Sequence, residues 1–339
     1  MPLVSGDFTE TELQNIRVKS SELMLDEMTK LQYTPSSLEV FNAVNAVQTA
    51  QINPLFGNPS KDDKVEIMDL HSCELETTEI TDCFSGTFNK NSTTVKELEL
   101  TQSRENKFQI DEKDLRDNSF TFEEAMAKSM LASEARIIED IQAYMVSVLN
   151  AGKGVNAYTG GVGTVSGSDT NVPDTSWTAA LYPYLLTVMK KNRFKNAAFL
   201  TDNDEFYQKM VSAQLNAGNA NGVGDLTSFN ALKTFFDMQI LSDVNSPDNI
   251  SYLLGLGSVA FASKPMYNTT LEQFDDHVRW SYQSSIVPGL WLNAIAKRDC
   301  SSNYVSQQVK IMAKYDLFVN PTGCDTERTG ILTFIKTVS

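Results

Sequence analysis

The chain has few of the residues that enzymes most often use for catalysis. Only two histidines occur among its 339 residues, His71 and His277, and neither lies beside a nucleophile motif. The motifs G-x-S-x-G and H-E-x-x-H are absent, which excludes the hydrolases that depend on them. A hydrolytic enzyme with paired carboxylates needs no local motif and stays open as an alternative. We therefore expect no enzymatic activity and no cofactor.

Basic residues are also scarce. The chain has 28 Lys and Arg against 43 Asp and Glu, for a net charge of −15. A nucleic-acid reader needs clustered Lys and Arg, and an anionic membrane would repel this chain. Residues 61–140 hold about 20 of the acids and 10 of the bases, so the acidity is concentrated there. We expect Asp62–Asp63 and Asp275–Asp276 to be solvated turn charges.

Long apolar runs and metal-type cysteine spacings are missing as well. No run of about 18 apolar residues occurs, which excludes a membrane-spanning helix, and no secretory signal is visible. The four cysteines contain no C-x-x-C, and neither histidine completes a zinc pattern. Their spacing would allow a disulfide between Cys73 and Cys83, but a product without a secretion signal favours four reduced thiols, at Cys73, Cys83, Cys300 and Cys324.

The glycine-rich segment 151–176 does not fit a phosphate-binding loop. That motif needs G-x-x-x-x-G-K-[ST] between a strand and a helix, whereas here Lys153 is followed by glycine in a segment that follows a helix. Gly160, Gly161 and Gly163 also fail the dinucleotide pattern. We expect a flexible surface loop.

The strongest helical pattern covers residues 119–150. Thr121 and Glu124 have the spacing of a capping box, and Gly152 stands where a terminating glycine belongs. About 30 residues at about 1.5 Å each give a rod of roughly 45 Å. The helix is either an ordinary core helix or the rod of a larger assembly. Its apolar residues recur at helical spacing, interrupted only at 133–134: Phe122, Met126, Met130, Ile137, Ile138, Ile141, Met145 and Val148.

Two helices are predicted before this one. The first covers 8–34, with Thr9 or Thr11 as its cap. It ends at Pro35, because the residue before a proline avoids the helical region. The second covers 37–51.

Strand patterns follow a break at 52–63 that contains two prolines and a glycine. In residues 64–111 the stretches KVEIMDL, KELELTQ and KFQID alternate polar and apolar residues, as half-exposed strands do. We expect a long charged hairpin or a pair of hairpins. A ribbon of this kind has little core of its own, so it rests on its own domain or on a neighbouring subunit.

The second half mixes helices and strands. We expect a helix over 177–191, a strand over 197–201 and a helix capped by Asp202 or Asn203, with 229–236 helical or extended. Few uninterrupted βαβ units occur, which predicts an α+β fold. Further strands are expected at 238–241, 250–254, 258–262, 278–285, 305–319 and 330–336.

This order of parts resembles the major capsid protein of tailed bacteriophages, the fold shared with encapsulin shells. A helical arm, an acidic ribbon, a long helix, a glycine-rich loop, AAFLTDNDEFYQKM and the final strands VKIMAKYDLFVNP and GILTFI carry the resemblance. It covers most of the chain and is topological, since the family has no strict motif. It implies an N-terminal arm (1–63), an extended β-loop (64–111), a peripheral domain (112–154 and 265–319) with the spine helix 119–150, an axial domain (155–264) and a C-terminal strand (320–339).

The resemblance implies a structural subunit of an icosahedral capsid. Copies would assemble into hexamers and pentamers around double-stranded DNA, in the host cytoplasm and then in the virion. Because the sequence runs from Met1 straight into the arm, we expect a separate scaffolding protein, besides a portal. DNA contact should be weak, because phosphate binding depends mainly on Lys and Arg. An encapsulin-type shell and a tail or decoration protein are the alternatives.

Candidate assembly contacts lie in two places. Asn89, Lys90 and Asn91 lie near the expected end of the extended loop. Some members of the family crosslink through a Lys and an Asn, but no pattern in this sequence assigns that chemistry to Lys90 and Asn91. Arg136 and Glu139 lie with an aspartate on one face of the spine helix.

The opposite face of the spine helix carries isoleucines one turn apart. We expect Ile137, Ile138 and Ile141 to pack on peripheral strands near Val309 and Ile311. The face with Arg136 would then be free to meet a neighbouring subunit.

Overall fold

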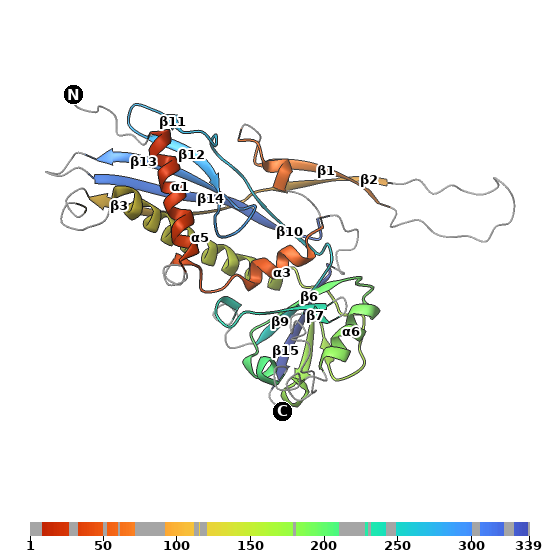
Figure 1. Ribbon diagram of the computed structural model, residues 1–339. Coiled ribbons are helices and arrows are strands. Elements are labelled where there is room, and N and C mark those ends of the chain that lie inside the picture. The colour runs from red at the N-terminus through yellow and green to blue at the C-terminus, as the bar shows by residue number, and fades with distance from the viewer. Residues whose placement is uncertain are drawn as a thin grey trace, which may run out of the picture.

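The computed structural model arranges the chain as two sheets, with the helices α1 (Glu10–Leu25), α3 (Glu39–Val47), α5 (Phe122–Ala151) and α6 (Leu181–Lys191) beside them, and a protruding two-stranded ribbon (Figure 1). The α+β class expected from the sequence is confirmed. The structure describes residues 9–26, 33–49, 53–59, 62–71, 92–111, 115, 121–178, 181–209, 228–229, 232–241, 249–299, 306–321 and 329–337.

The six-stranded sheet is built on one long strand, β14 (Ser306–Val319). One edge of β14 pairs with β13 (Trp291–Asp299) and then with β10 (Val259–Ser263), and the other edge pairs with β3 (Gln102–Asp111). Strands β12 (Val278–Gln283) and β11 (Glu272–Gln273) complete it. All these pairs are antiparallel. The sequence predicted β14 closely but missed β13.

The seven-stranded sheet has the order β4-β5-β15-β9-β6-β8-β7. Its inner strand β6 (Ala197–Thr201) is fully buried, because helices cover both faces. Ala198 and Leu200 face α3 (Glu39–Val47), and Ala197 and Phe199 face α6 (Leu181–Lys191). Burial on both faces explains the uninterrupted apolar run AAFLT.

The remaining strands of this sheet come from distant parts of the chain. The C-terminal strand β15 (Ile331–Thr337) lies between β5 (Asp169–Pro173) and β9 (Ile250–Gly255), parallel to the first and antiparallel to the second. The other three strands lie toward its edges: β4 (Thr164–Ser166), β8 (Leu232–Phe236) and β7 (Ser228–Phe229).

The ribbon consists of β1 (Lys64–His71) and β2 (Ser92–Glu99), paired antiparallel from Lys64↔Glu99 outward. It projects away from the body of the molecule (Figure 1). The sequence predicted three strands in 64–111, and all three form. The third is β3, however, and it belongs to the six-stranded sheet through β14. The ribbon therefore ends at Glu99 rather than at residue 111.

Helix α5 (Phe122–Ala151) is the long rod that the sequence predicts. The Thr121 hydroxyl accepts from the Glu124 N–H at 3.2 Å, while the Glu124 carboxylate pairs with Lys128 at 3.2 Å. Gly152 terminates the helix at φ −91, outside the left-handed region. A Cβ there would lie 2.8 Å from a Val319 methyl, so close packing rather than backbone freedom requires glycine.

The N-terminal helices hold the two sheets together. Helix α1 (Glu10–Leu25) begins in a capping box between Thr9 and Glu12 and packs on α5. Helix α3 contacts strands of both sheets, β6 and β10 among them, so it fixes their relative position. A single 3-10 turn, η1 (Asn53–Phe56), separates α3 from the ribbon.

Three sequence predictions in the second half need correction. Residues 164–166 and 169–173 of the expected surface loop form β4 and β5, because β5 completes the edge of β15. The helix expected from residue 177 begins at Leu181, after the 3-10 turn η2 (Asp174–Ser176). Residues 238–241 are not a strand. The Asp237 carboxylate accepts from the N–H groups of Gln239 and Leu241 and starts a helical turn.

Candidate assembly surfaces

The base of the ribbon is fixed by a partly buried ion-pair cluster. Asp63 accepts from Lys264 at 3.0 Å and from Lys314, and the Lys264 side chain is only 6% exposed. Burial alone would raise the pKa of Asp63, but the bonds and charges of Lys314 and Lys264 lower it below its usual value. The expectation that Asp63 is a solvated turn charge was wrong, because the two lysines that bind it come from distant parts of the sequence.

An apolar cluster supports the same end of the ribbon. Phe56, Leu98 and Leu100 pack with Ala260 and Ala262 of β10. Beyond this point the described side chains are largely exposed and charged, and Lys64 pairs with Glu97 at 2.6 Å and with Glu99 at 3.2 Å. These contacts anchor the ribbon at its base. Asn89, Lys90 and Asn91 lie outside the described residues.

The inner face of the spine helix α5 is buried as expected. Ile137, Ile138 and Ile141 belong to the same core cluster as Val309 and Ile311 of β14. Helix α5 packs across β3 and β14. The predicted helix register and the predicted packing partner are both confirmed.

The two candidate contact residues on the outer face of α5, Arg136 and Glu139, lie in different environments. The Arg136 side chain is 75% exposed and donates to Glu139 at 2.9 Å. The Glu139 side chain is 23% exposed, and it also accepts from the backbone N–H of Ser36 at 2.9 Å. Glu139 therefore joins α5 to the segment before α3 and is not free, whereas Arg136 and the neighbouring Asp140 are exposed.

Glu134 occupies the interruption in the apolar stripe of α5. It is almost fully buried and accepts from the Ser284 hydroxyl at 2.5 Å, the Ile286 N–H at 3.2 Å and the Ser285 hydroxyl at 3.4 Å. Burial raises the pKa of Glu134, and these bonds offset only part of that rise. The sequence signal was its position, one turn from both Met130 and Ile138 on the buried stripe.

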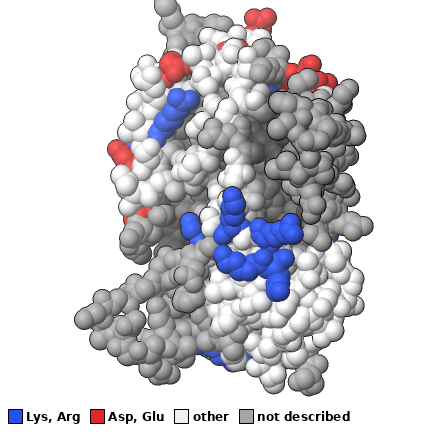
Figure 2. All heavy atoms as spheres, turned by 90° about the vertical axis from the view of Figure 1, so that its right-hand side faces the viewer, with Lys and Arg blue, Asp and Glu red and all other residues white. Residues whose placement is uncertain are grey.

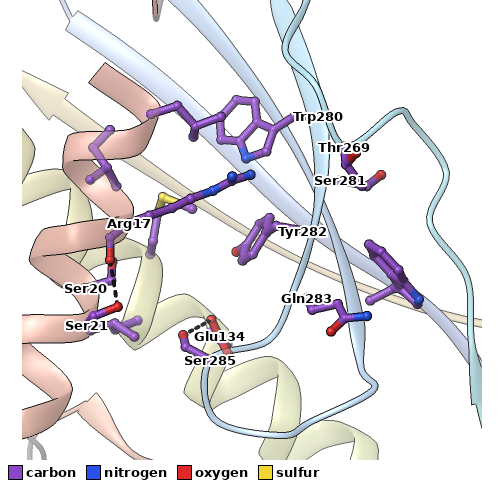
Figure 3. Close-up of a pocket in the computed structure, with 15 residues that line it drawn as sticks. Arg17, Ser20, Ser21, Glu134, Thr269, Trp280, Ser281, Tyr282, Gln283 and Ser285 are labelled. Carbon is purple, nitrogen blue, oxygen red and sulfur yellow. Dashed lines mark hydrogen bonds between the residues drawn. The ribbon is translucent and has the colours of Figure 1, made fainter. Parts of the chain in front are cut away.

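A cavity of about 340 Å³ lies beside Glu134, between α1, α5 and β12 (Figure 3). Arg17 extends from α1 toward Trp280 and Tyr282, and Glu134 lies at the α5 side. The Tyr282 hydroxyl is buried and has no hydrogen-bond partner among the described residues. Burial, with the negative charge of Glu134, raises the pKa of Tyr282 well above its usual value. The Glu134 carboxylate is bound by residues 284–286, so it joins α5 to the segment that follows β12.

His277 lies in an ordered surface cluster. Its Nδ1 lies 2.6 Å from the Asp276 carboxylate, and its ring stacks on Phe274. The Arg279 guanidinium lies over the Phe274 ring, 4.4 Å from its centre, and donates to Glu272 at 2.6 Å. These contacts bind a surface turn together and place no nucleophile beside the histidine. The His71 side chain lies outside the described part of the chain.

Asp202 is the carboxyl group that best fits the alternative of an enzyme with paired carboxylates. Burial raises the pKa of Asp202 to about 6, and the charge of Asp237 adds to this rise. Asp237, however, accepts from the Ser37 hydroxyl at 2.8 Å besides capping the helical turn that follows it. The pair is accounted for by structure, because one carboxylate is fully used as a cap.

Two further observations limit the chemistry. Among the side chains that the structure describes, no three or more of His, Cys, Asp and Glu gather in a way that could hold a metal ion. No helix in the described ranges is long and apolar enough to cross a membrane. The four cysteines, at 73, 83, 300 and 324, all fall outside those ranges, so the prediction of free thiols stays a prediction.

Comparison with known proteins shows which solved structures share this architecture. No protein-family model and no curated protein sequence matches the chain. A solved structure from Mycobacterium phage Che8 matches with a TM-score of 0.53 at 16% identity and covers 86% of this chain and 90% of that one. The capsid of Ralstonia phage GP4 matches with a TM-score of 0.51 at 10% identity, covering 90% and 92%. The chain has the fold of tailed-phage major capsid proteins, as the sequence predicted.

Proposed function

We propose that this chain is the structural subunit of an icosahedral phage capsid, assembling into hexamers and pentamers that enclose double-stranded DNA. The observation that carries the proposal is the agreement of the whole architecture with solved phage structures, over at least 86% of both chains. Fold alone does not fix function. The surfaces of this chain supply the second line of support.

The ribbon supports an assembled state. It leaves the body of the subunit, and the side chains described at 64–66 and 95–97 are exposed or only partly buried. An isolated two-stranded ribbon is marginal in water, so a neighbouring copy would supply the missing contacts. We assign residues 64–99 to the extended loop and Asn89, Lys90 and Asn91 to its contact end.

The other parts follow from the sheets. We assign residues 1–63 to the arm, the six-stranded sheet with α5 to the peripheral domain and the seven-stranded sheet to the axial domain. The strand within 320–339 belongs with the axial sheet, because β15 lies between β5 and β9. Arg136 is the remaining candidate contact on α5. Glu139 would act by orienting Arg136 rather than by direct contact.

The charge of the chain suits a container for DNA. A net charge of −15 limits phosphate contacts, which depend mainly on Lys and Arg. We propose a scaffolding protein and a portal as further partners and a shell with no catalytic role. The subunit would act in the host cytoplasm during assembly and then in the virion.

Gel filtration of the purified chain tests the proposal against its alternatives. A shell subunit elutes as very large particles or as a polydisperse set of capsomers. An enzyme with paired carboxylates would elute as one small closed oligomer at every protein concentration. That second result, together with activity lost in Asp202→Asn, would overturn the proposal.

A further inference from the structure

Four exposed cations gather at one turn of this acidic protein. The turn joins α6 to β6, and Figure 2 shows basic side chains concentrated on this side of the molecule. None of the four has an ion pair within the described residues, whereas most other described lysines are paired. They are Lys190, Lys191, Arg193 and Lys195, and we call them the α6 basic turn.

The residues between these cations anchor the turn. The Asn192 amide donates to the Val188 carbonyl at 2.8 Å and to Asn156 at 2.9 Å. The Phe194 N–H donates to the Met189 carbonyl at 2.9 Å, and its ring packs against Gly255, where a Cβ would approach within 2.9 Å. Alternate residues therefore point inward and hold the backbone, while the cations point outward. A preorganised surface loses little conformational entropy when it binds a partner.

The helix dipole explains only part of this arrangement. Lys190 and Lys191 lie in the last turn of α6, where cations interact favourably with the helix C-terminus. That effect falls off beyond the last turn, so it does not account for Arg193 or Lys195. Arg193 also has φ +62, a left-handed conformation that favours glycine. A long cationic side chain thus occupies a position where the backbone alone would favour another residue.

The chemistry of the partner follows from the charge balance. With a net charge of −15, the chain outside these four cations carries −15 − 4 = −19. Any two copies therefore repel each other unless uncompensated cations of one meet acids of the other. Nucleic acid is disfavoured as the partner, because the same surplus of acid repels phosphates.

We propose that the α6 basic turn is a contact between copies, in which these cations bind exposed Asp and Glu side chains of a neighbouring subunit. The inference rests on the proposed shell function and adds to it a specific electrostatic contact. Such contacts fix orientation and suppress wrong pairings more than they add affinity. They also make assembly sensitive to salt.

Zero-length crosslinking tests the contact in assembled particles. A carbodiimide activates a carboxylate, which then forms an amide with a lysine amine in direct contact, and the reagent takes up the water. Particles assembled from equal parts of ¹⁴N and ¹⁵N protein distinguish bonds between copies from bonds within one. We expect Lys190, Lys191 or Lys195 in mixed-isotope crosslinks to an Asp or Glu.

Two variants separate the contact from a structural role. Lys190→Glu with Lys191→Glu should lower particle yield at least about tenfold, because like charges then face each other. Arg193→Gly should leave monomer melting unchanged or raise it, since glycine relieves the left-handed backbone, yet assembly should weaken. Replacing the three lysines with arginine keeps the charge and should keep the yield.

Three results would overturn the inference. One is a normal particle yield from the double Glu variant, together with parent particles that contain no mixed-isotope crosslink at this turn. Another is duplex DNA that binds the parent and not the double Glu variant, which would identify a nucleic-acid surface instead. If the parent forms no particles under any condition, the proposed function fails and this contact fails with it.

Discussion

The side chains of Glu134 and Ser284 lie 150 residues apart in sequence and are joined by a hydrogen bond of 2.5 Å. Glu134 comes from the middle of α5, and Ser284 directly follows β12 of the six-stranded sheet. The Ile286 N–H binds the same carboxylate. This bond fixes the long helix along its own axis, which apolar contacts with β3 and β14 do less well because they are not directional.

The position of Glu134 predicts a specific pH dependence of stability. Its pKa is higher in the folded chain than the usual value of 4.5. The folded state therefore binds a proton more readily, so this contribution to stability is fully present below pH 4.5 and is lost as the pH rises through the folded pKa. Glu134→Gln removes the titration. Urea unfolding at several pH values should show the parent losing stability relative to the variant as the pH rises. A stability difference that is the same at every pH would contradict the assignment.

Truncating a side chain on the inner face of α5 should lower stability, whereas truncating one on the outer face should lower assembly. Ile141 is fully buried against the β14 side of the core, so Ile141→Ala should cost about 2–5 kcal/mol of unfolding free energy. Arg136→Ala removes an exposed pair and should cost about 0–1 kcal/mol. Thermal melting of each monomer measures both changes in stability. A particle count measures whether Arg136→Ala also lowers assembly. If Ile141→Ala melts like the parent, the packing described here is wrong, and if Arg136→Ala assembles normally, Arg136 is only a surface charge.

The ion-pair cluster at the base of the ribbon should be important for stability. Asp63→Asn removes the carboxylate that pairs with the buried Lys264 ammonium and with Lys314, and should cost about 1–3 kcal/mol. Because the pKa of Asp63 is lowered, the parent should lose this stabilisation as the pH falls below the usual value of 3.8 toward the folded pKa. Asp62→Asn, at the exposed neighbour, is the matched control and should change stability by less than about 0.5 kcal/mol. Equal effects of the two substitutions in denaturant melts would argue against a specific role for Asp63.

Assembly should protect the ribbon from hydrogen exchange. Among the described residues, β1 and β2 form a sheet of two strands that pair only with each other, and such edges open readily. In a shell they would be covered by a neighbouring copy. Exchange measured by mass spectrometry on subunits and on particles should show slower exchange over 64–99 in particles, with β6 equally protected in both. The same protection of the ribbon in both states would mean that it packs on its own chain.

The elements that were predictable from sequence are those with long or uninterrupted patterns. The 30-residue helix has a cap and a repeating apolar stripe, and β6 and β14 are apolar or alternating runs. The Ile141 face could be assigned because helical spacing fixes which residues share a face. Strand β13 was missed because its residues are nearly all partly or fully buried, so polar and apolar positions do not alternate.

The contacts that depend on residues distant in sequence were not predictable. Nothing near Asp63 in sequence indicates that Lys264 and Lys314 meet it, and nothing near β3 indicates that it leaves the ribbon for β14. Glu139 likewise appeared free because its partner Ser36 lies 103 residues away. Periodicity specifies which face is buried, whereas pairing depends on topology.

Electron microscopy of the purified full chain, alone and co-expressed with a scaffolding protein, tests the central claim most directly. The account predicts closed shells of uniform diameter, or free hexamers and pentamers that close into shells when the scaffold is present. It also predicts that Arg136→Ala and the double Glu variant of the α6 basic turn reduce the number of shells, and that the Arg136→Ala monomer melts like the parent. A single small oligomer under every condition, with no capsomer and no shell, would contradict the account.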